Sequence, residues 1–451
     1  MTLNSKSFTW LLEPIRRFMN NSAFSGILLF SAAILSMIIA NSPFSDQFHH
    51  FWETKFVVGF EDFNLNRSLH HWINDGLMSI FFFVVGLELK REIIAGELRN
   101  PKNAILPVVA AICGMLFPAL IYMLFNSTGE ASYGWGIPMA TDIAFALGIL
   151  YLFGDKVPVS LKVFLTTIAI VDDLGAVLVI AFFYTSEINF TSLSVAGGFL
   201  VLLAIANRLG VRNTLFYGLV GIIGIWVSFM MSGVHATISA VLLAFTIPAR
   251  VKFTESKYIS QMNFLMNKFK EAQTTNAPTV SEEQLEIIEK IKEVGKNAVT
   301  PLQSLEYYLH PLVAYFVMPI FALSNAGVAL WQDSFIQIGN SVTMGVLVSL
   351  ILGKFIGVVG SVLLLEKLNI AKLPREINTL HLVGVGFLAA IGFTMSLFIA
   401  ELASQDRLFL LQAKLGILIA SLISGLIGYF CIRAALQKKI EIALKHSETR
   451  A

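Results

Sequence analysis

The stretch VFLTTIAIVDDLGAVLVIAF, residues 163–182, is apolar apart from two threonines and an adjacent pair of acids, Asp172 and Asp173. About 20 such residues in an α-helix cover the ~30 Å hydrocarbon core of a bilayer. Each carboxylate near the centre of such a helix costs about 2.5–3.5 kcal/mol on insertion scales. The stretch therefore predicts a membrane-spanning helix that carries two acids for a functional reason.

The composition of the whole chain supports a membrane protein. Of the 451 residues, 56% are hydrophobic and 14% charged, whereas soluble domains carry about 25% charged residues. A net charge of +2 gives no case for a nucleic-acid partner. We expect an all-α polytopic membrane protein with about 12 transmembrane helices in a lipid bilayer. The expected spans are 24–40, 70–89, 104–125, 134–153, 159–184, 191–207, 213–231, 234–249, 309–330, 340–365, 379–401 and 409–432.

Basic residues occur in every second connection between these spans. The positive-inside rule makes those connections cytoplasmic, and with them both termini. The intervening connections at 126–133, 185–190, 232–233 and 331–339 have no Lys or Arg. The basic groups are Lys6, Arg16 and Arg17; Lys90, Arg91, Arg99 and Lys102; Lys156; Arg208 and Arg212; Arg250 onward; Lys367, Lys372 and Arg375; and Arg433, Lys438 and Lys439.

The spans predict one integral membrane transporter domain over residues 1–451, with spans at about 24–249 and 309–432. A long charged connection at 250–308 interrupts them on the cytoplasmic side. Within it, Leu285, Ile287, Ile288 and Ile291 predict an amphipathic helix over 281–294. On the external side, residues 52–66 predict a β-hairpin.

Two more charges are expected at the depth of the aspartate pair. Lys354 lies in the tenth span, and Asp142 lies near the centre of the fourth, next to Thr141. A buried ion-pair network that fixes helix packing is the simpler interpretation, but one lysine cannot neutralise three acids. We favour a functional site in which Asp172 and Asp173 are about 100° apart on their helix, so that one faces Lys354 and the other a water-filled cavity.

The chemistry of this site suits ion exchange. Carboxylate oxygens and the Thr141 hydroxyl are ligands for a small hard cation. The same carboxylates bind protons, so protons and cations compete for one site. Exposing the site alternately to either side of the membrane is then sufficient for exchange. The sequence has no GxxxxGK[ST] phosphate-binding motif, so coupling to ATP has no support and no cofactor is expected.

Two spans carry residues that interrupt helices. Gly136 and Pro138 lie in the fourth span, just before Asp142, and Gly386 and Gly392 lie in the eleventh. If spans three to five and ten to twelve are equivalent triplets, the fold is an inverted-topology repeat whose fourth and eleventh spans are interrupted and cross at the ion site. Half-helix ends carry partial charges, which Asp142 and Lys354 would compensate. Close helix packing is the alternative explanation of the glycines.

Seven segments of the chain resemble the NhaA-type sodium/proton antiporter family in order and on the expected spans. They are FFFVVGLELKRE (81–92), ATDIAFALG (140–148), AIVDDLGA (169–176), SGVHATIS (232–239), LHPLVAYFVMPIFALSNAGV (309–328), GKFIGV (353–358) and AAIGFTMS (389–396).

The resemblance implies pH-regulated, electrogenic exchange of cytoplasmic Na⁺ or Li⁺ for external H⁺. It implies Na⁺ at Asp173 and Asp172, with Asp173 as the main ligand, and Asp172 in proton exchange and paired with Lys354. Thr141 and Asp142 would line the crossed half-helices. It also implies a bacterial inner membrane and a homodimer joined through the external hairpin at 45–67.

The family's pH response is associated with a cytoplasmic funnel, which in this sequence would comprise Glu88, Arg91, Glu92, Glu306 and His310. An ordinary interfacial charge cluster explains these residues equally well. The sequence departs from the family pattern at Gln303 and Ser304, where basic residues are usual, and in the length of the 250–300 segment. His235 could sense pH, although a structural histidine is the simpler interpretation.

Other functions fit the residues less well. An intramembrane aspartyl protease would use a GxGD motif, which is absent from the sequence, and a serine protease would need a histidine on another span than its nucleophile. The chain is therefore not expected to be an enzyme. A channel would be hindered by deep Asp and Lys that trap ions. A proton- or sodium-coupled symporter of a small organic acid is the main alternative, because interrupted helices also bind carboxylates.

Overall fold

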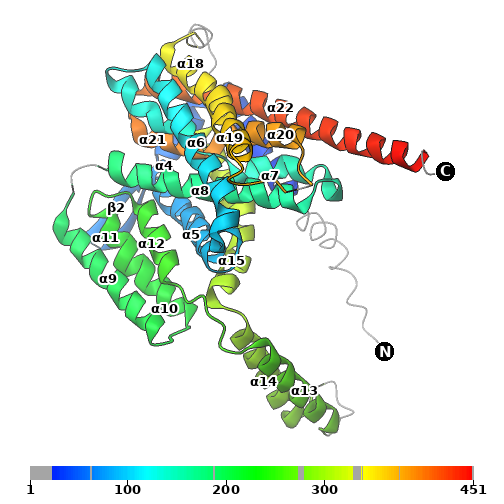
Figure 1. Ribbon diagram of the computed structural model, residues 1–451. Helices are drawn as coiled ribbons and strands as arrows, with labels where there is room; N and C mark the ends of the chain where they lie inside the picture. The colour runs from blue at the N-terminus through cyan, green and yellow to red at the C-terminus, as the bar shows by residue number, and fades with distance from the viewer. Residues whose placement is uncertain are drawn as a thin grey trace, which may run out of the picture.

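The computed structural model describes residues 23–60, 63–185, 188–272, 279–328, 337, 339–374 and 376–448. Almost all of this chain is helical (Figure 1). Strands β1 (Lys55–Phe60) and β2 (Phe63–Ser68) form an antiparallel hairpin, with Lys55 opposite Ser68. The predicted all-α class and the hairpin are confirmed. Lys6, Arg16 and Arg17, on which the predicted orientation of the N-terminus depends, lie outside the described residues.

Several spans consist of an α-helix joined directly to a short π-helical segment. The helical elements are α2 (Ala23–Ala40), α3 (Ser45–Glu53), α4 (Leu69–His71), η1 (Trp72–Leu77), α5 (Met78–Ala95), η2 (Glu97–Arg99), α6 (Pro101–Phe125), η3 (Glu130–Met139), α7 (Ile143–Tyr151), η4 (Gly154–Lys156), α8 (Val159–Phe183), α9 (Phe190–Arg208), α10 (Thr214–Leu219), η5 (Val220–Trp226), α11 (Val227–Met230), α12 (Ala236–Thr246), α13 (Glu255–Glu271), α14 (Glu282–Ala298), α15 (Pro301–Leu312), η6 (Val313–Val317), α16 (Met318–Asn325), α18 (Ser341–Val348), η7 (Ser349–Gly353), η8 (Ile356–Gly360), α19 (Ser361–Lys367), α20 (Thr379–Ala389), α21 (Phe393–Ala403) and α22 (Arg407–Glu448).

By length and composition, eight helices of the described chain are able to cross a membrane. The number is nine if Phe24–Ala40 and Ser45–Glu53, bent by 115°, count as one span. This is fewer than the twelve expected. The expected spans at 213–231 and 234–249 contain shorter apolar helices, Thr214–Met230 and Ala236–Thr246. The second is about 16 Å long at 1.5 Å per residue, which is short of a ~30 Å hydrocarbon layer.

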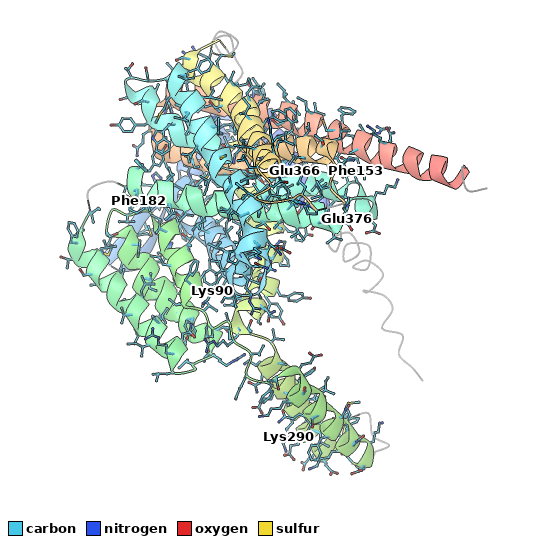
Figure 2. All side chains as sticks on the ribbon, in the orientation of Figure 1. Lys90, Phe153, Phe182, Lys290, Glu366 and Glu376 are labelled. Atoms are coloured by element: carbon cyan, nitrogen blue, oxygen red, sulfur yellow. The ribbon has the colours of Figure 1, made fainter. Side chains whose placement is uncertain are left out.

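Apolar side chains cover much of the outside of the bundle. Leu124, Leu209 and Phe182 are 83%, 79% and 78% exposed, and Phe182 lies on the outer side of α8 (Figure 2). Soluble monomers rarely expose apolar surface this extensively. Together with the long apolar helices, this surface identifies a polytopic membrane protein whose outer side chains face lipid.

The spans pack as two groups of helices (Figure 1). In the first, which we call the core bundle, α6 packs against α8 and against the η7–η8 segment, and α22 packs against α18 and α20. In the second, the flanking bundle, α5 packs against α12 and α15, α12 against α9, and α2 against α16. The core bundle thus contains the third to fifth and tenth to twelfth expected spans.

Within the 250–308 connection, α13 and α14 form a helix pair that projects from the bundle (Figures 1 and 2, near Lys290). Its helices α13 and α14 pair through a small apolar core of Leu265, Ala272 and Ile287. The helix predicted over 281–294 is confirmed as α14, although Leu285 is 50% exposed instead of joining that core.

Candidate functional site

Two segments of the core bundle are interrupted near their middle, and the interruptions touch. Three non-helical residues separate η3 from α7, and residues 390–392 separate α20 from α21. The backbone N–H of Asp142 donates to the carbonyl of Ile391 at 2.7 Å. The polypeptide therefore crosses itself at this point, with helix ends directed at one another.

The four predicted helix-interrupting residues lie beside these crossings. Gly136 and Pro138 are in η3, Gly386 is in α20, and Gly392 immediately precedes α21. A Cβ on Gly136 would lie 2.6 Å from the Tyr184 hydroxyl, and one on Gly386 would lie 2.5 Å from a methyl of Val359. At these two positions glycine permits close packing, which is the alternative that the sequence left open.

Asp142 caps both helices that begin at the crossing. Its Oδ1 accepts from the Phe145 N–H of α7 at 3.0 Å, and its Oδ2 accepts from the N–H of Thr394 in α21 at 3.0 Å. The Thr394 hydroxyl also donates to Oδ2, at 2.5 Å. Because helix N-termini carry about +0.5 of an elementary charge each, one buried carboxylate compensates two helix ends.

Hydroxyl groups bond the carbonyls at the facing C-terminal ends. Ser396 donates to the carbonyl of Ile137 in η3 at 2.7 Å, and Thr141 to that of Ala389, the last residue of α20, also at 2.7 Å. The sequence predicted that Lys354 would compensate these ends. Its ammonium lies 2.5 Å from Oδ2 of Asp172, the pairing that the family resemblance implied, and both side chains are fully buried.

Asp172 connects the ammonium group to the crossing. Its Oδ2, besides bonding Lys354, lies 2.7 Å from the Thr141 hydroxyl. That hydroxyl has one hydrogen but lies within bonding distance of two acceptors, Asp172 and the Ala389 carbonyl. Donation to Asp172 and donation to Ala389 are therefore alternatives, and the choice depends on whether Asp172 carries a proton.

Asp173 is the least satisfied buried group in this region. Within the described chain, neither of its carboxylate oxygens has a hydrogen-bond partner, and Oδ1 of Asp172 has none either. Both aspartates have 0% exposure. Buried carboxylate oxygens normally have a hydrogen-bond partner from protein or water, so three oxygens without a protein partner on one helical turn are suited to bind protons, water or a cation.

A cavity of about 370 Å³ lies between the flanking bundle and the first turn of α7. Glu88 of α5 and His310 of α15 line it, and so do Ile143 and Ala144, which follow Asp142 directly. The cavity therefore runs from the α15 side toward the crossing.

Two of the predicted funnel residues, Glu88 and His310, line this cavity, and the other three form an ion-pair group next to it. Arg91 bonds Glu306 through Nε at 3.0 Å and Glu92 through a terminal nitrogen at 3.0 Å. Glu88 and His310 are one helical turn from this ion-pair group, on the same two helices.

His235 is separate from the cavity group. Its Nδ1 is 3.9 Å from a carboxylate oxygen of Asp75. Asp75 and Glu88 stand thirteen positions apart on the continuous helix 69–95, which corresponds to about 20 Å. The structure thus brings together five of the six residues considered for a pH response.

Three polar residues of the site were not singled out from the sequence. Thr394 and Ser396 are in the family-like segment AAIGFTMS, so that segment was the available signal. Tyr184, whose hydroxyl accepts from the Gly136 N–H and donates to the Tyr133 carbonyl, ends the fifth span and carries no comparable signal.

Comparison with known proteins supports one interpretation of this geometry. Residues 16–432 match the model of the family described as Na⁺/H⁺ antiporter 1. The chain is 48% identical over 428 residues to the Na(+)/H(+) antiporter NhaA of Oleidesulfovibrio alaskensis, covering 95% of each chain. It is 44% identical over 431 residues to NhaA 2 of Syntrophotalea carbinolica, covering 95% of this chain and 98% of that one. It is also 44% identical to NhaA of Helicobacter pylori, covering 94% and 97%.

Proposed function

This chain belongs to the Na⁺/H⁺ antiporter 1 family, and from that premise we propose that it exchanges Na⁺ for H⁺ at Asp172 and Asp173. The observation that carries this proposal is the set of three unpartnered, fully buried carboxylate oxygens on adjacent residues of α8. The chain is accordingly a membrane transporter, and its substrates are ions.

Na⁺ would bind through oxygen ligands, as hard cations do. Both oxygens of Asp173 and Oδ1 of Asp172 are free to coordinate within the described chain, and the Thr141 hydroxyl lies 2.7 Å from the other oxygen of Asp172. We assign Asp173 as the main ligand because its carboxylate makes no competing hydrogen bond. Li⁺ presents the same hard chemistry.

Protons would compete for the same atoms. When Asp172 takes up a proton, its attraction to Lys354 falls and the Thr141 hydroxyl can turn wholly to the Ala389 carbonyl. When Na⁺ enters, it replaces the protons, because a nearby cation lowers the affinity of the buried carboxylates for protons. Lys354 keeps Asp172 ionised in the intervening state, and Asp142 holds the helix ends in place throughout.

Alternating access would arise from motion of the core bundle against the flanking bundle. The two triplets of the core bundle, with their touching interruptions, support an inverted repeat, an architecture in which one bundle rocks against another around a fixed site. The cavity lined by Glu88 and His310 would connect the site to the cytoplasm. The neighbouring ion-pair group of Arg91, Glu92 and Glu306 would adjust access with pH.

The proposed membrane, orientation, charge stoichiometry and oligomeric state of the transporter follow from the distribution of basic residues and from the family resemblance. We propose residence in a bacterial inner membrane with both termini cytoplasmic, supported by the basic connections. We also propose electrogenic exchange, with more protons entering than sodium ions leaving, and a homodimer joined through 45–67, where β1 and β2 form an edge available for pairing.

The test uses everted membrane vesicles that hold an acid-inside pH gradient. Addition of NaCl should produce dequenching of a pH-sensitive dye in the wild type. The assay covers the range from about pH 6.5, the unperturbed pKa of histidine, to about pH 8.5. Asp173→Asn should abolish this response. Asp155→Asn, the same change in an exposed connection, is the matched control and should respond like the wild type, and choline chloride should produce no response. Normal sodium-driven exchange by Asp173→Asn would refute the site, and a wild type without any sodium response would refute the function.

A further inference from the structure

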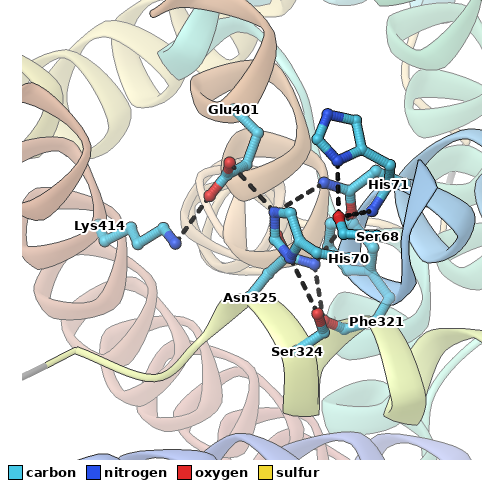
Figure 3. Close-up of polar contacts among 9 residues, drawn as sticks. Ser68, His70, His71, Phe321, Ser324, Asn325, Glu401 and Lys414 are labelled. Atoms are coloured by element: carbon cyan, nitrogen blue, oxygen red, sulfur yellow. Dashed lines mark hydrogen bonds and ion pairs between the residues drawn. The ribbon is translucent and has the colours of Figure 1, made fainter. Parts of the chain in front are cut away.

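A second polar cluster joins the two bundles at the end opposite the cavity (Figure 3). His70 in α4, Asn74 in η1 and Ser324 in α16 belong to the flanking bundle, whereas Glu401 in α21 and Lys414 in α22 belong to the core bundle. His70 and Glu88 are eighteen positions apart on the helix 69–95, which corresponds to about 27 Å. The cluster is therefore separate from the funnel and lies beside the β1–β2 hairpin.

Glu401 divides its two oxygens between the bundles. Oε1 is 2.7 Å from the Lys414 ammonium, within the core bundle, and Oε2 is 3.3 Å from Nε2 of His70, across the boundary (Figure 3). The three side chains are 13%, 14% and 25% exposed. The pair is thus shielded enough to matter energetically, while His70 still reaches water that can supply a proton.

Nε2 of His70 faces two partners that require opposite protonation states. The Asn325 amide donates to the Phe321 carbonyl and to Oδ1 of Asn74, at 3.1 Å each. This bonding fixes the orientation of the Asn74 amide, so its NH₂ points at Nε2 of His70, also at 3.1 Å. A neutral ring with its proton on Nδ1 accepts from Asn74 at Nε2, whereas the doubly protonated ring donates from Nε2 to Glu401 and carries the positive charge that makes this contact an ion pair. Nδ1, at 3.1 Å from the Ser324 hydroxyl, has a partner in both states.

We propose that His70 and Glu401 form a proton-operated external latch between the bundles, a property that rests on the proposed antiport function. Protonated His70 pairs with Glu401 and holds the external side closed, and neutral His70 turns to Asn74 and releases it. Lys414 on α22 also faces Glu401, and the adjacent His71 interacts electrostatically with His70, Glu401, Arg67 and Asp75. Lys414 is bound to the other oxygen of Glu401, so it does not replace His70.

The latch acts on the half-helix that forms the ion site. Glu401 follows Thr394 by seven residues, two turns along α21, and Thr394 is the residue that bonds Asp142. Holding the far end of α21 to the flanking bundle therefore restrains the crossing itself. Low external pH should favour the arrangement that is closed on the external side and slow the release of sodium there.

The experiment measures efflux of radioactive sodium from right-side-out membrane vesicles, with the internal pH clamped and the external pH set to about 5.5 or about 8.5, on either side of the usual histidine range. His70→Gln should accelerate efflux relative to the wild type about three- to fivefold at the lower pH, the factor expected for loss of one partly exposed ion pair. At the higher pH the ratio should be near one. His71→Gln is the matched control, because that ring contacts the Ser68 hydroxyl, and its ratio should be near one at both pH values. An equal ratio for His70→Gln at both pH values, or the same effect from His71→Gln, would overturn the latch.

A second measurement does not depend on transport. Amide hydrogen exchange over residues 393–403 should be slower in the wild type than in His70→Gln at the lower pH and equal at the higher pH, with Glu401→Gln behaving like His70→Gln. Equal exchange of wild type and both variants at the lower pH would contradict the proposal. If no protein gave sodium efflux, the antiport function would be wrong, and hydrogen exchange would still decide whether the latch exists.

Discussion

Oδ2 of Asp142 accepts hydrogen bonds from both the backbone N–H and the hydroxyl of Thr394, 252 positions later in the chain. These two bonds join the interrupted segments to each other independently of the aspartate pair on α8. The crossing is thus a structural unit whose integrity can be separated experimentally from ion binding.

Thr394→Val should weaken this unit. The change preserves side-chain shape and removes the hydroxyl donor to a fully buried carboxylate, for which we expect a loss of about 1–3 kcal/mol of stability. Thermal unfolding of detergent-purified protein provides the measurement. Thr394→Ser keeps the donor and should unfold near the wild-type temperature. Equal unfolding temperatures for the valine variant and the wild type would contradict this role of the hydroxyl.

Lys354→Met should destabilise the protein more strongly, by about 3–5 kcal/mol, because it leaves the Asp172 carboxylate buried without its cation. Combining it with Asp172→Asn removes both charges and should recover most of the lost stability without restoring exchange. The unfolding temperatures of the two single variants and the double variant complete a mutant cycle. Additive losses in the double variant would show that the two groups are not coupled.

Gly357→Ala should separate two helices that position Lys354. A Cβ at Gly357 would contact the Cys113 carbonyl oxygen of α6 inside van der Waals distance, whereas one at Gly360 would meet its nearest neighbour at 4.0 Å. We expect a loss of about 1–3 kcal/mol and reduced exchange for Gly357→Ala, with Gly360→Ala behaving like the wild type. Unfolding and vesicle assays on the pair provide the check, and equal behaviour of both variants would show that the close approach is unimportant.

Ala314→Trp should block the cavity without unfolding the protein. Ala314 lines the cavity, and an indole there would fill much of the passage toward the crossing. Leu312→Trp places the same ring on a residue that is 42% exposed and outside the cavity, so it serves as the control. Sodium-driven dequenching should be lost in the first variant and retained in the second. Full activity of Ala314→Trp would mean that ions reach the site by another route.

The sequence was sufficient for the residues whose chemistry conflicts with their surroundings. Asp172, Asp173, Asp142 and Lys354 are ionisable groups inside apolar runs, and the structure buries all four. Their roles in transport stay predictions. The pairing of Lys354 with Asp172 was predicted as well, from the family resemblance.

The sequence was insufficient to identify residues that bond to partners far away in the chain, or whose side chains are common polar ones. Thr394, Ser396 and Tyr184 acquire their importance only when the two interrupted segments meet. The sequence predicted that meeting but not which side chains would bond across it. The latch is similar, because His70 and Glu401 are 331 positions apart. The count of twelve spans stays a prediction, because a continuous apolar run does not disclose that α12 ends after eleven residues.

The helix pair of α13 and α14 has a practical consequence. Since Leu265, Ala272 and Ile287 give it a core of its own away from the lipid-facing surface, it offers antibody fragments a folded epitope outside a detergent micelle. A complex formed there would give electron-microscopy particles an asymmetric feature for alignment, on a protein whose remaining mass is largely concealed by the micelle.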